Sequence, residues 1–185
     1  MKKDTVIMTL LLCISGVLFF ASLFVIYSDA NRYYPESGQY SPALLAAYCA
    51  DLYDRGLCDK NGLDQTILID TREKADYEKG HLLGAVNLAF DKNSLMELLK
   101  NAPDDFHVLI YGYEDQWKEN KEMARLMREI RWPAAYHVTE GYDELARTEG
   151  MHKFLDTAAH QLEPIHFELL PSEVDIVNAF FDNRQ

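Results

Sequence analysis

The chain has 185 residues, of which 18 are basic and 30 are acidic, and its net charge at pH 7 is −12. This length accommodates one compact domain with some additional segments. The acidity excludes a typical nucleic-acid-binding protein, because such proteins present basic patches to the phosphate backbone. No group of Cys and His residues has the spacing of a metal site, so neither a metal nor another cofactor is expected.

The N-terminus contains a long apolar segment. Residues 5–27 carry no charged side chain and exceed the roughly 20 residues that a transmembrane helix needs. We therefore predict an uncleaved signal anchor at residues 5–27. The alternative is a cleaved signal peptide, whose apolar core spans only about 7–15 residues, although Ser28-Asp29-Ala30 provides small residues at a suitable spacing for cleavage.

The charges that flank this segment predict its orientation. Lys2 and Lys3 precede the segment, so residues 1–4 are expected in the cytoplasm and the main domain outside it, in the periplasm if the membrane is a bacterial inner membrane. Without Lys2, Lys3 and Asp4 the chain has 16 basic and 29 acidic residues, a net charge of −13. An anionic lipid surface repels such a domain, so contact with the bilayer is expected through residues 5–27.

Two cysteines lie beyond the apolar segment. Cys49 and Cys58 are nine positions apart, and an oxidising compartment permits a disulfide between them. The alternative is a pair of partly buried thiols. The sequence leaves both possibilities open.

The remaining chain alternates helical and extended patterns. Residues 28–40 are polar and aromatic and are expected to be a linker, after which Ser41-Pro42 starts a helix that Gly56 ends. Strands are expected at 66–70, 85–88, 107–111 and 135–138, and further helices at 73–79, 94–99 and 120–130. This alternation predicts an α/β fold with a parallel sheet that helices cover on both faces.

The C-terminal residues 151–185 are expected to form a helical extension. Pro171-Ser172-Glu173 is a start signal, and the residues that follow place Val174, Val177, Phe180 and Phe181 on one face of a helix. An apolar face of this kind is expected to dock, either on the chain's own domain as an added core helix or on a membrane partner.

One segment carries a family signature. DTREKADYEKGHLLGAVNL, from Asp70 to Leu88, resembles the rhodanese (sulfurtransferase) family in its strand ending in Asp-x-Arg, its short helix, its Gly-His and Gly-Ala pairs and its second strand. EGYDELA, from Glu140, resembles the closing motif of that family in weakened form. The resemblance covers residues 41–150 and implies a rhodanese-like parallel sheet flanked by helices on both faces.

The motif residues are expected to be architectural. They are Asp70, Arg72, Gly80, His81, Gly84 and Gly141. Asp70 and Arg72 leave the same strand end, where a local ion pair would fix the following turn. We expect His81 to hydrogen-bond nearby backbone, and the glycines to provide backbone conformations or close approaches that a side chain would block.

The resemblance implies a catalytic cysteine directly after the central strand, which is HVLIY at 107–111. The next residue here is Gly112, and the loop contains no cysteine; its residues are Gly112, Tyr113, Glu114, Asp115, Gln116, Trp117 and Lys118. Carboxylates near the start of the next helix are favoured by the helix dipole and would occupy the site of an incoming anion.

We therefore expect no catalytic residue in this chain. The predicted function is a non-catalytic, membrane-anchored rhodanese-like module that binds a membrane protein partner or serves as an accessory subunit of a membrane complex. The alternative is a membrane-tethered sulfurtransferase or related enzyme that uses a relocated cysteine, Cys49 or Cys58.

Overall fold

The computed structural model describes residues 15, 19, 38–59, 62–157 and 169–183. The chain divides into two compact units, Met1–Pro35 and Glu36–Gln185. Within the described residues, no helix combines the length and apolar character needed to cross a membrane. The anchor predicted at 5–27 lies outside the described residues, apart from Ser15 and Phe19, and so does the N-terminal segment 1–4.

The second unit is built on a parallel sheet, as the sequence predicted. In the described part of the chain this sheet has five strands in the order β1-β8-β7-β4-β6; they are β1 (Gln39–Tyr40), β4 (Thr66–Asp70), β6 (Val86–Asn87), β7 (His107–Tyr111) and β8 (Ala135–Val138). Asp70 is paired with Tyr111 in the register of β4 and β7. The loops that begin at Thr71 and Gly112 therefore leave the sheet side by side.

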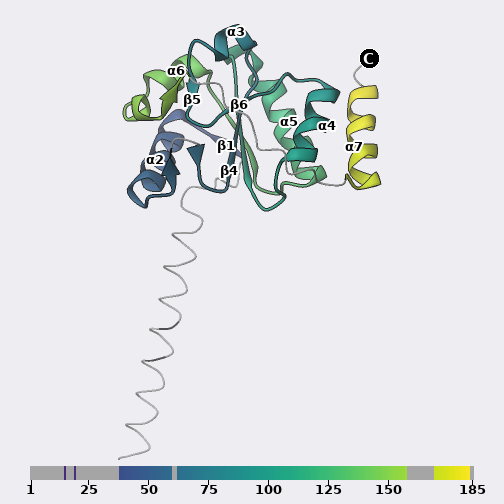
Figure 1. The fold of residues 1–185 in the computed structure, drawn as a ribbon, viewed down its shortest axis with the longest axis horizontal. Helices are drawn as coiled ribbons and strands as arrows, with labels where there is room; N and C mark the ends of the chain where they lie inside the picture. The colour runs from purple at the N-terminus through teal and green to yellow at the C-terminus, as the bar shows by residue number, and fades with distance from the viewer. Residues whose placement is uncertain (1–14, 16–18, 20–37, 60–61, 158–168, 184–185) are drawn as a thin grey trace, which may run out of the picture. The chain divides into compact units, whose positions relative to one another are not determined.

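Helices lie on both sides of this sheet (Figure 1). One side carries α2 (Pro42–Asp54) and α6 (Tyr142–Arg147), and the other carries α4 (Lys92–Asn101) and α5 (Trp117–Ile130). The short helix α3 (Lys74–Tyr77) follows β4. As expected, Ser41 caps α2, since its hydroxyl accepts a hydrogen bond from Leu44 N at 3.2 Å. The main core lies between the sheet and α4 and α5, and Trp132 is fully buried in it.

The prediction of a linker over residues 28–40 is wrong for its last two residues. Gln39 and Tyr40 form the strand β1, which pairs in parallel with β8. Tyr40 is 1% exposed, and its ring lies 5.4 Å from that of Tyr136. A two-residue strand has no periodicity to detect, so the polar residues around it gave the appearance of a linker.

Two small antiparallel ladders were also missed. One joins β2 (Cys58–Asp59) to β3 (Gly62–Leu63), and the other joins β5 (His81–Leu82) to β9 (Leu155–Asp156). The strand β9 and the 3-10 helix η2 (Met151–Phe154) belong to the region predicted as a helical extension. Met151 and Phe154 are buried in the domain. The beginning of 151–185 is therefore part of the domain itself.

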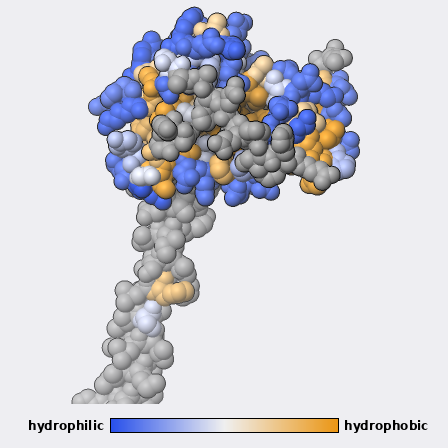
Figure 2. Space-filling view, viewed as in Figure 1, coloured by the Kyte–Doolittle hydropathy of each residue, from blue (hydrophilic) through white to orange (hydrophobic). Residues whose placement is uncertain are grey.

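The last helix, α7 (Pro171–Asp182), docks on its own domain. Val177 is fully buried in the main core, and the ring of Phe90 lies 6.1 Å from that of Phe180 and 5.8 Å from that of Phe181. Figure 2 shows that some apolar residues remain at the surface around α7. Of the two docking surfaces that the sequence left open, the structure shows the chain's own.

A buried ion pair fixes the start of α7. Arg131 donates from Nε to Glu173 Oε1 at 2.7 Å and from Nη2 to Oε2 at 2.9 Å, and its Nη1 donates to Leu99 O at 2.8 Å. The two side chains are 10% and 5% exposed. Hydrogen bonds from Arg131, opposed by burial, hold the pKa of Glu173 below its ordinary value of 4.5.

We expect Glu173→Gln to reduce the free energy of unfolding at neutral pH by about 2 kcal/mol, because it removes hydrogen bonds to a charged group and leaves Arg131 buried without its counter-charge. Since the pKa is lowered on folding, this contribution is complete above pH 4.5 and is lost as the pH falls through the lower folded value. Urea unfolding of both proteins across this range should show the difference shrinking in acid. Glu97→Gln, which changes an exposed carboxylate on α4, is the matched control and should cost little.

Candidate functional site

A cleft opens where the carboxyl ends of the strands meet, which is the ligand-binding edge of open parallel sheets. Its volume is about 820 Å³. Its walls come from the loops after β4, β7 and β8, from the start of α2 and from α6. The site can therefore be described loop by loop.

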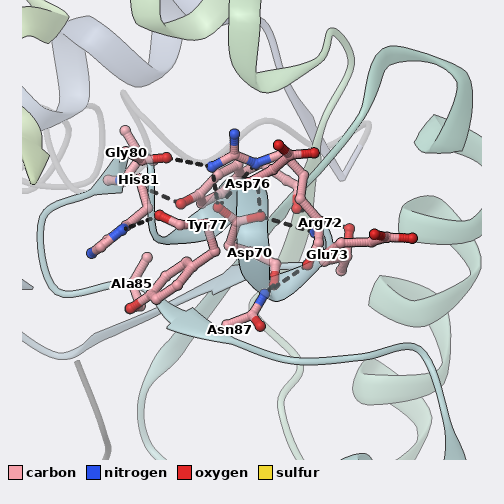
Figure 3. Close-up of polar contacts among 12 residues, drawn as sticks. Asp70, Arg72, Glu73, Asp76, Tyr77, Gly80, His81, Ala85 and Asn87 are labelled. Carbon is pink, nitrogen blue, oxygen red and sulfur yellow. Dashed lines mark hydrogen bonds and ion pairs between the residues drawn. The ribbon is translucent and has the colours of Figure 1, made fainter. Parts of the chain in front are cut away.

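The loop after β4 is organised by a buried ion pair (Figure 3). Arg72 donates to Asp70 from Nε at 3.0 Å and from Nη2 at 2.7 Å, and its backbone N–H donates to the same carboxylate at 2.9 Å. Asp70 is 0% and Arg72 is 6% exposed. Arg72 Nη2 also donates to Gly80 O at 2.6 Å, and the guanidinium lies 3.5 Å from the centre of the Tyr142 ring.

The ion pair keeps Arg72 charged and joins two parts of the chain. Burial by itself would lower the pKa of Arg72, but the hydrogen bond and charge of Asp70 raise it above its ordinary value, so the guanidinium stays charged. With its donors directed to Asp70 and Gly80, Arg72 holds the strand end to the turn eight residues later. The local ion pair that the sequence suggested for Asp70 and Arg72 is thus present.

His81 packs inside the segment that follows β4. It is fully buried, its Nδ1 lies 2.8 Å from Tyr77 O, and its ring stacks on that of Tyr77 with centroids 3.8 Å apart. Tyr77 in turn donates from its hydroxyl to Ala85 O at 2.6 Å. Gly84 then turns the chain at φ +75°, a conformation that side-chain-bearing residues rarely adopt. Together these contacts fold the segment between β4 and β6.

The position after β7 has no room for a side chain. A Cβ placed on Gly112 would lie 2.2 Å from Thr71 Oγ1 and 3.1 Å from Asn120 Nδ2. The Thr71 hydroxyl is held there, 2.9 Å from Asn120 Oδ1 and 3.1 Å from Tyr111 O. The backbone N–H of Thr71 also donates to Tyr111 O at 2.9 Å. The space at residue 112 is therefore filled by Thr71, which Asn120 secures from α5.

The rest of this loop is held from two sides. It forms the 3-10 helix η1 (Glu114–Gln116), which runs directly into α5. On one side, the Tyr113 hydroxyl donates to Asp76. On the other, Tyr142 N donates to Gly112 O at 2.8 Å, and a Cβ on Gly141 would lie 2.6 Å from Glu114 N, so only glycine allows this approach.

Neither cysteine lies at this site. Cys49, on α2, is 1% exposed, and burial raises its pKa to about 12, so its thiol is protonated at neutral pH and is a poor nucleophile. Cys58 lies half-buried on β2. No disulfide joins these two cysteines in the structure, although both are among the described residues. Neither one lines the cleft.

The structure brings six of the predicted site residues together at the cleft, fewer than half of them. Arg72, Gly80, Gly112, Tyr113, Glu114 and Gly141 all line the cleft. In the part of the chain that the structure describes, no group of three or more His, Cys, Asp or Glu side chains could hold a metal ion. Sequence reasoning missed Thr71 and Asn120. The burial of Asn120 could have been recognised from the sequence, because this residue shares the helical face of the apolar Met123, Ala124 and Met127.

Comparison with known families agrees with this architecture. The family model described as the rhodanese-like domain matches residues 51–148, which is more than half of the chain. This range includes β4, β6, β7 and β8 and the loops that form the cleft. No curated protein matches the chain. On its fold and on this match, the chain belongs to the rhodanese-like domain family.

Proposed function

We propose that this protein is a non-catalytic member of its family, anchored to a membrane through residues 5–27, and that it acts as a binding module or accessory subunit of a membrane protein complex. The observation that carries the proposal is the position after β7. Gly112 has no nucleophilic group, and the Thr71 hydroxyl occupies the space that a side chain there would need. Nucleophilic catalysis requires an activated side chain, and none is present at this point.

The electrostatics of the cleft support the same proposal. Sulfur transfer in this family carries an anionic persulfide, which positive potential stabilises. Here Glu114 and Asp115 occupy the first turn of η1, and Glu119 occupies the first turn of α5. Their carboxylates already interact favourably with the helix dipole, so an incoming anion meets negative charge where it would need positive charge.

The membrane part of the proposal rests on the sequence. The uncharged stretch at 5–27 has the length of a membrane span, and the two lysines before it favour a cytoplasmic N-terminus. In this arrangement the domain presents its cleft on the outer side of the membrane, beside the outer parts of other membrane proteins.

The test is a sulfurtransferase assay on the full chain in nonionic detergent, with thiosulfate or mercaptopyruvate as donor and cyanide as acceptor. We expect no turnover above the buffer blank. An active rhodanese added to the same detergent should keep its activity, which controls for inhibition by the detergent. Turnover that disappears in the Cys49→Ser or the Cys58→Ser variant would instead establish the enzyme with a relocated cysteine.

A further inference from the structure

We infer that the cleft at the carboxyl edge of the sheet, together with the hollow beside Trp117, receives a segment of a protein partner that carries lysine or arginine side chains. The inference rests on the proposed binding function and specifies the chemistry of the partner. Four observations support it: the charge of the cleft, the ion pairs of its basic residues, the aromatic surface beside it and the size of the combined surface.

The cleft carries an excess of negative charge. Five acidic and three basic side chains line it: Asp76, Glu114, Glu140, Asp143 and Glu144 against Arg72, Lys79 and Arg147. Each basic side chain already has a carboxylate partner: Lys79 with Asp76 at 2.5 Å, Arg147 with Glu144 at 3.1 Å and Arg72 with Asp70 at 2.7 Å. Anionic ligands therefore find no basic group here that lacks a counter-charge.

Three of the carboxylates remain available to a ligand. Glu114, Glu140 and Asp143 are exposed, and none of them forms an ion pair within the described part of the chain, although Glu140 accepts a hydrogen bond from the Thr139 hydroxyl. Helix starts at this edge would normally favour an anion, but Asp143 and Glu144 lie in the first turn of α6 and offset its dipole, as Glu114 does at η1. The surface is thus complementary to positive charge.

An aromatic surface adjoins this charge. A second hollow of about 660 Å³ shares Tyr113, Glu114 and Glu140 with the cleft and adds Asp115 and Trp117. Trp117 is 40% exposed, which is unusual for so large an apolar side chain. The chain's own Lys118 Nζ lies 5.7 Å from the centre of the Trp117 ring, so this ring already attracts a cation. A partner's cation that takes this place, with carboxylates beside it, gains both a cation–π contact and charge-assisted hydrogen bonds.

The size of the combined surface favours a chain segment as its occupant. A drug-sized ligand fills a pocket of about 300–1,000 Å³. The cleft alone has about 820 Å³, and the hollow beside Trp117 extends it. Carboxylates lie along both parts, so a segment with two or more basic side chains can satisfy them together, whereas a single small cation cannot.

The test uses the full chain in nonionic detergent and a labelled short peptide of alternating arginine and serine, with a glutamate–serine peptide of equal length as the negative probe. Fluorescence anisotropy at about 0.15 M salt screens long-range attraction beyond about 8 Å. We expect the arginine peptide alone to bind. The triple variant Glu114→Gln, Glu140→Gln, Asp143→Asn should weaken its binding at least tenfold.

The matched control changes the charge by the same amount elsewhere. Asp64, Asp104 and Asp105 are exposed and precede β4 or β7, at the opposite edge of the sheet. Their replacement by asparagine should leave peptide binding within twofold of the original. Trp117 gives a local signal as well, since Trp132 is fully buried, so the peptide should change the tryptophan fluorescence and Trp117→Phe should abolish that change.

Two results would overturn this inference. One is the absence of binding by the arginine peptide. The other is that the cleft variant and the control variant weaken peptide binding equally, which would mean that the peptide is attracted to the overall negative charge of the chain and not to the cleft. Neither result affects the proposed non-catalytic function, which the sulfurtransferase assay tests separately. Conversely, turnover in that assay would refute the proposed function even if the peptide binds.

Discussion

Gly112→Cys is expected to destabilise the domain by about 3 kcal/mol and to leave it without sulfurtransferase activity. Its Cβ would meet the Thr71 hydroxyl at 2.2 Å, far inside van der Waals contact. Moving Thr71 aside breaks its part-buried hydrogen bond with the buried Asn120, so the cost of overpacking is added to that of an unsatisfied polar group. Urea unfolding of the variant, followed by circular dichroism, measures the loss.

The clash can be tested with a second substitution. Thr71→Ala removes the hydroxyl but keeps Cβ, which lies 3.5 Å from the added atom, an ordinary contact. The double variant should therefore regain at least 1 kcal/mol relative to the sum of the two single losses. Gly150→Ala is the control, because its φ of +87° causes strain that Thr71→Ala cannot relieve. Additive losses for Gly112 and Thr71 would show that the two positions do not compete for space.

Asp70→Asn is expected to cost about 3–5 kcal/mol, the range for breaking a buried ion pair by removing one partner. Asp70 is fully buried and accepts from the guanidinium and from the backbone N–H of Arg72. Asparagine keeps one acceptor oxygen but leaves Arg72 without a counter-charge in the interior. Loss of this contact also frees the turn at Gly80, so the cleft should open together with the loss of stability.

A surface ion pair provides the comparison. Asp51 on α2 lies 3.3 Å from Arg55, the residue that follows this helix, and their side chains are 31% and 62% exposed. Asp51→Asn should cost less than about 1 kcal/mol. Denaturant unfolding at pH 7 distinguishes the two substitutions. If Asp70→Asn costs no more than Asp51→Asn, the Asp-x-Arg pair does not hold the domain together and another role must be sought for it.

The sequence predicted the inner strands of the central sheet but missed the edge strand β1 and both short antiparallel ladders. The strands at 66–70 and 107–111 were predicted with the bounds that the structure shows, because each is a continuous run of branched and apolar residues between polar ends. Tyr40, at the edge of the sheet, was missed since its burial depends on β8, almost a hundred residues later in the chain. Local pattern carries no information about such a pairing.

The candidate site was likewise predicted only in part. The glycine after the central strand and the carboxylates of the loop are visible in the sequence. That Thr71 fills the space beside Gly112 is not visible, because it follows from the register of β4 and β7, which places residues forty positions apart next to each other. The ion pair between Arg131 and Glu173 was missed for the same reason, since it joins residues of separate helical segments.

The shortness of the outer strands has a consequence for association between copies of the chain. Both edges of the described central sheet, β1 and β6, are only two residues long, whereas β4 and β7 at its centre have five residues each. An open sheet edge is a template for strands of other molecules, and its length determines how many backbone hydrogen bonds an intruding strand can form. With two residues at either edge, the sheet resists edge-to-edge aggregation.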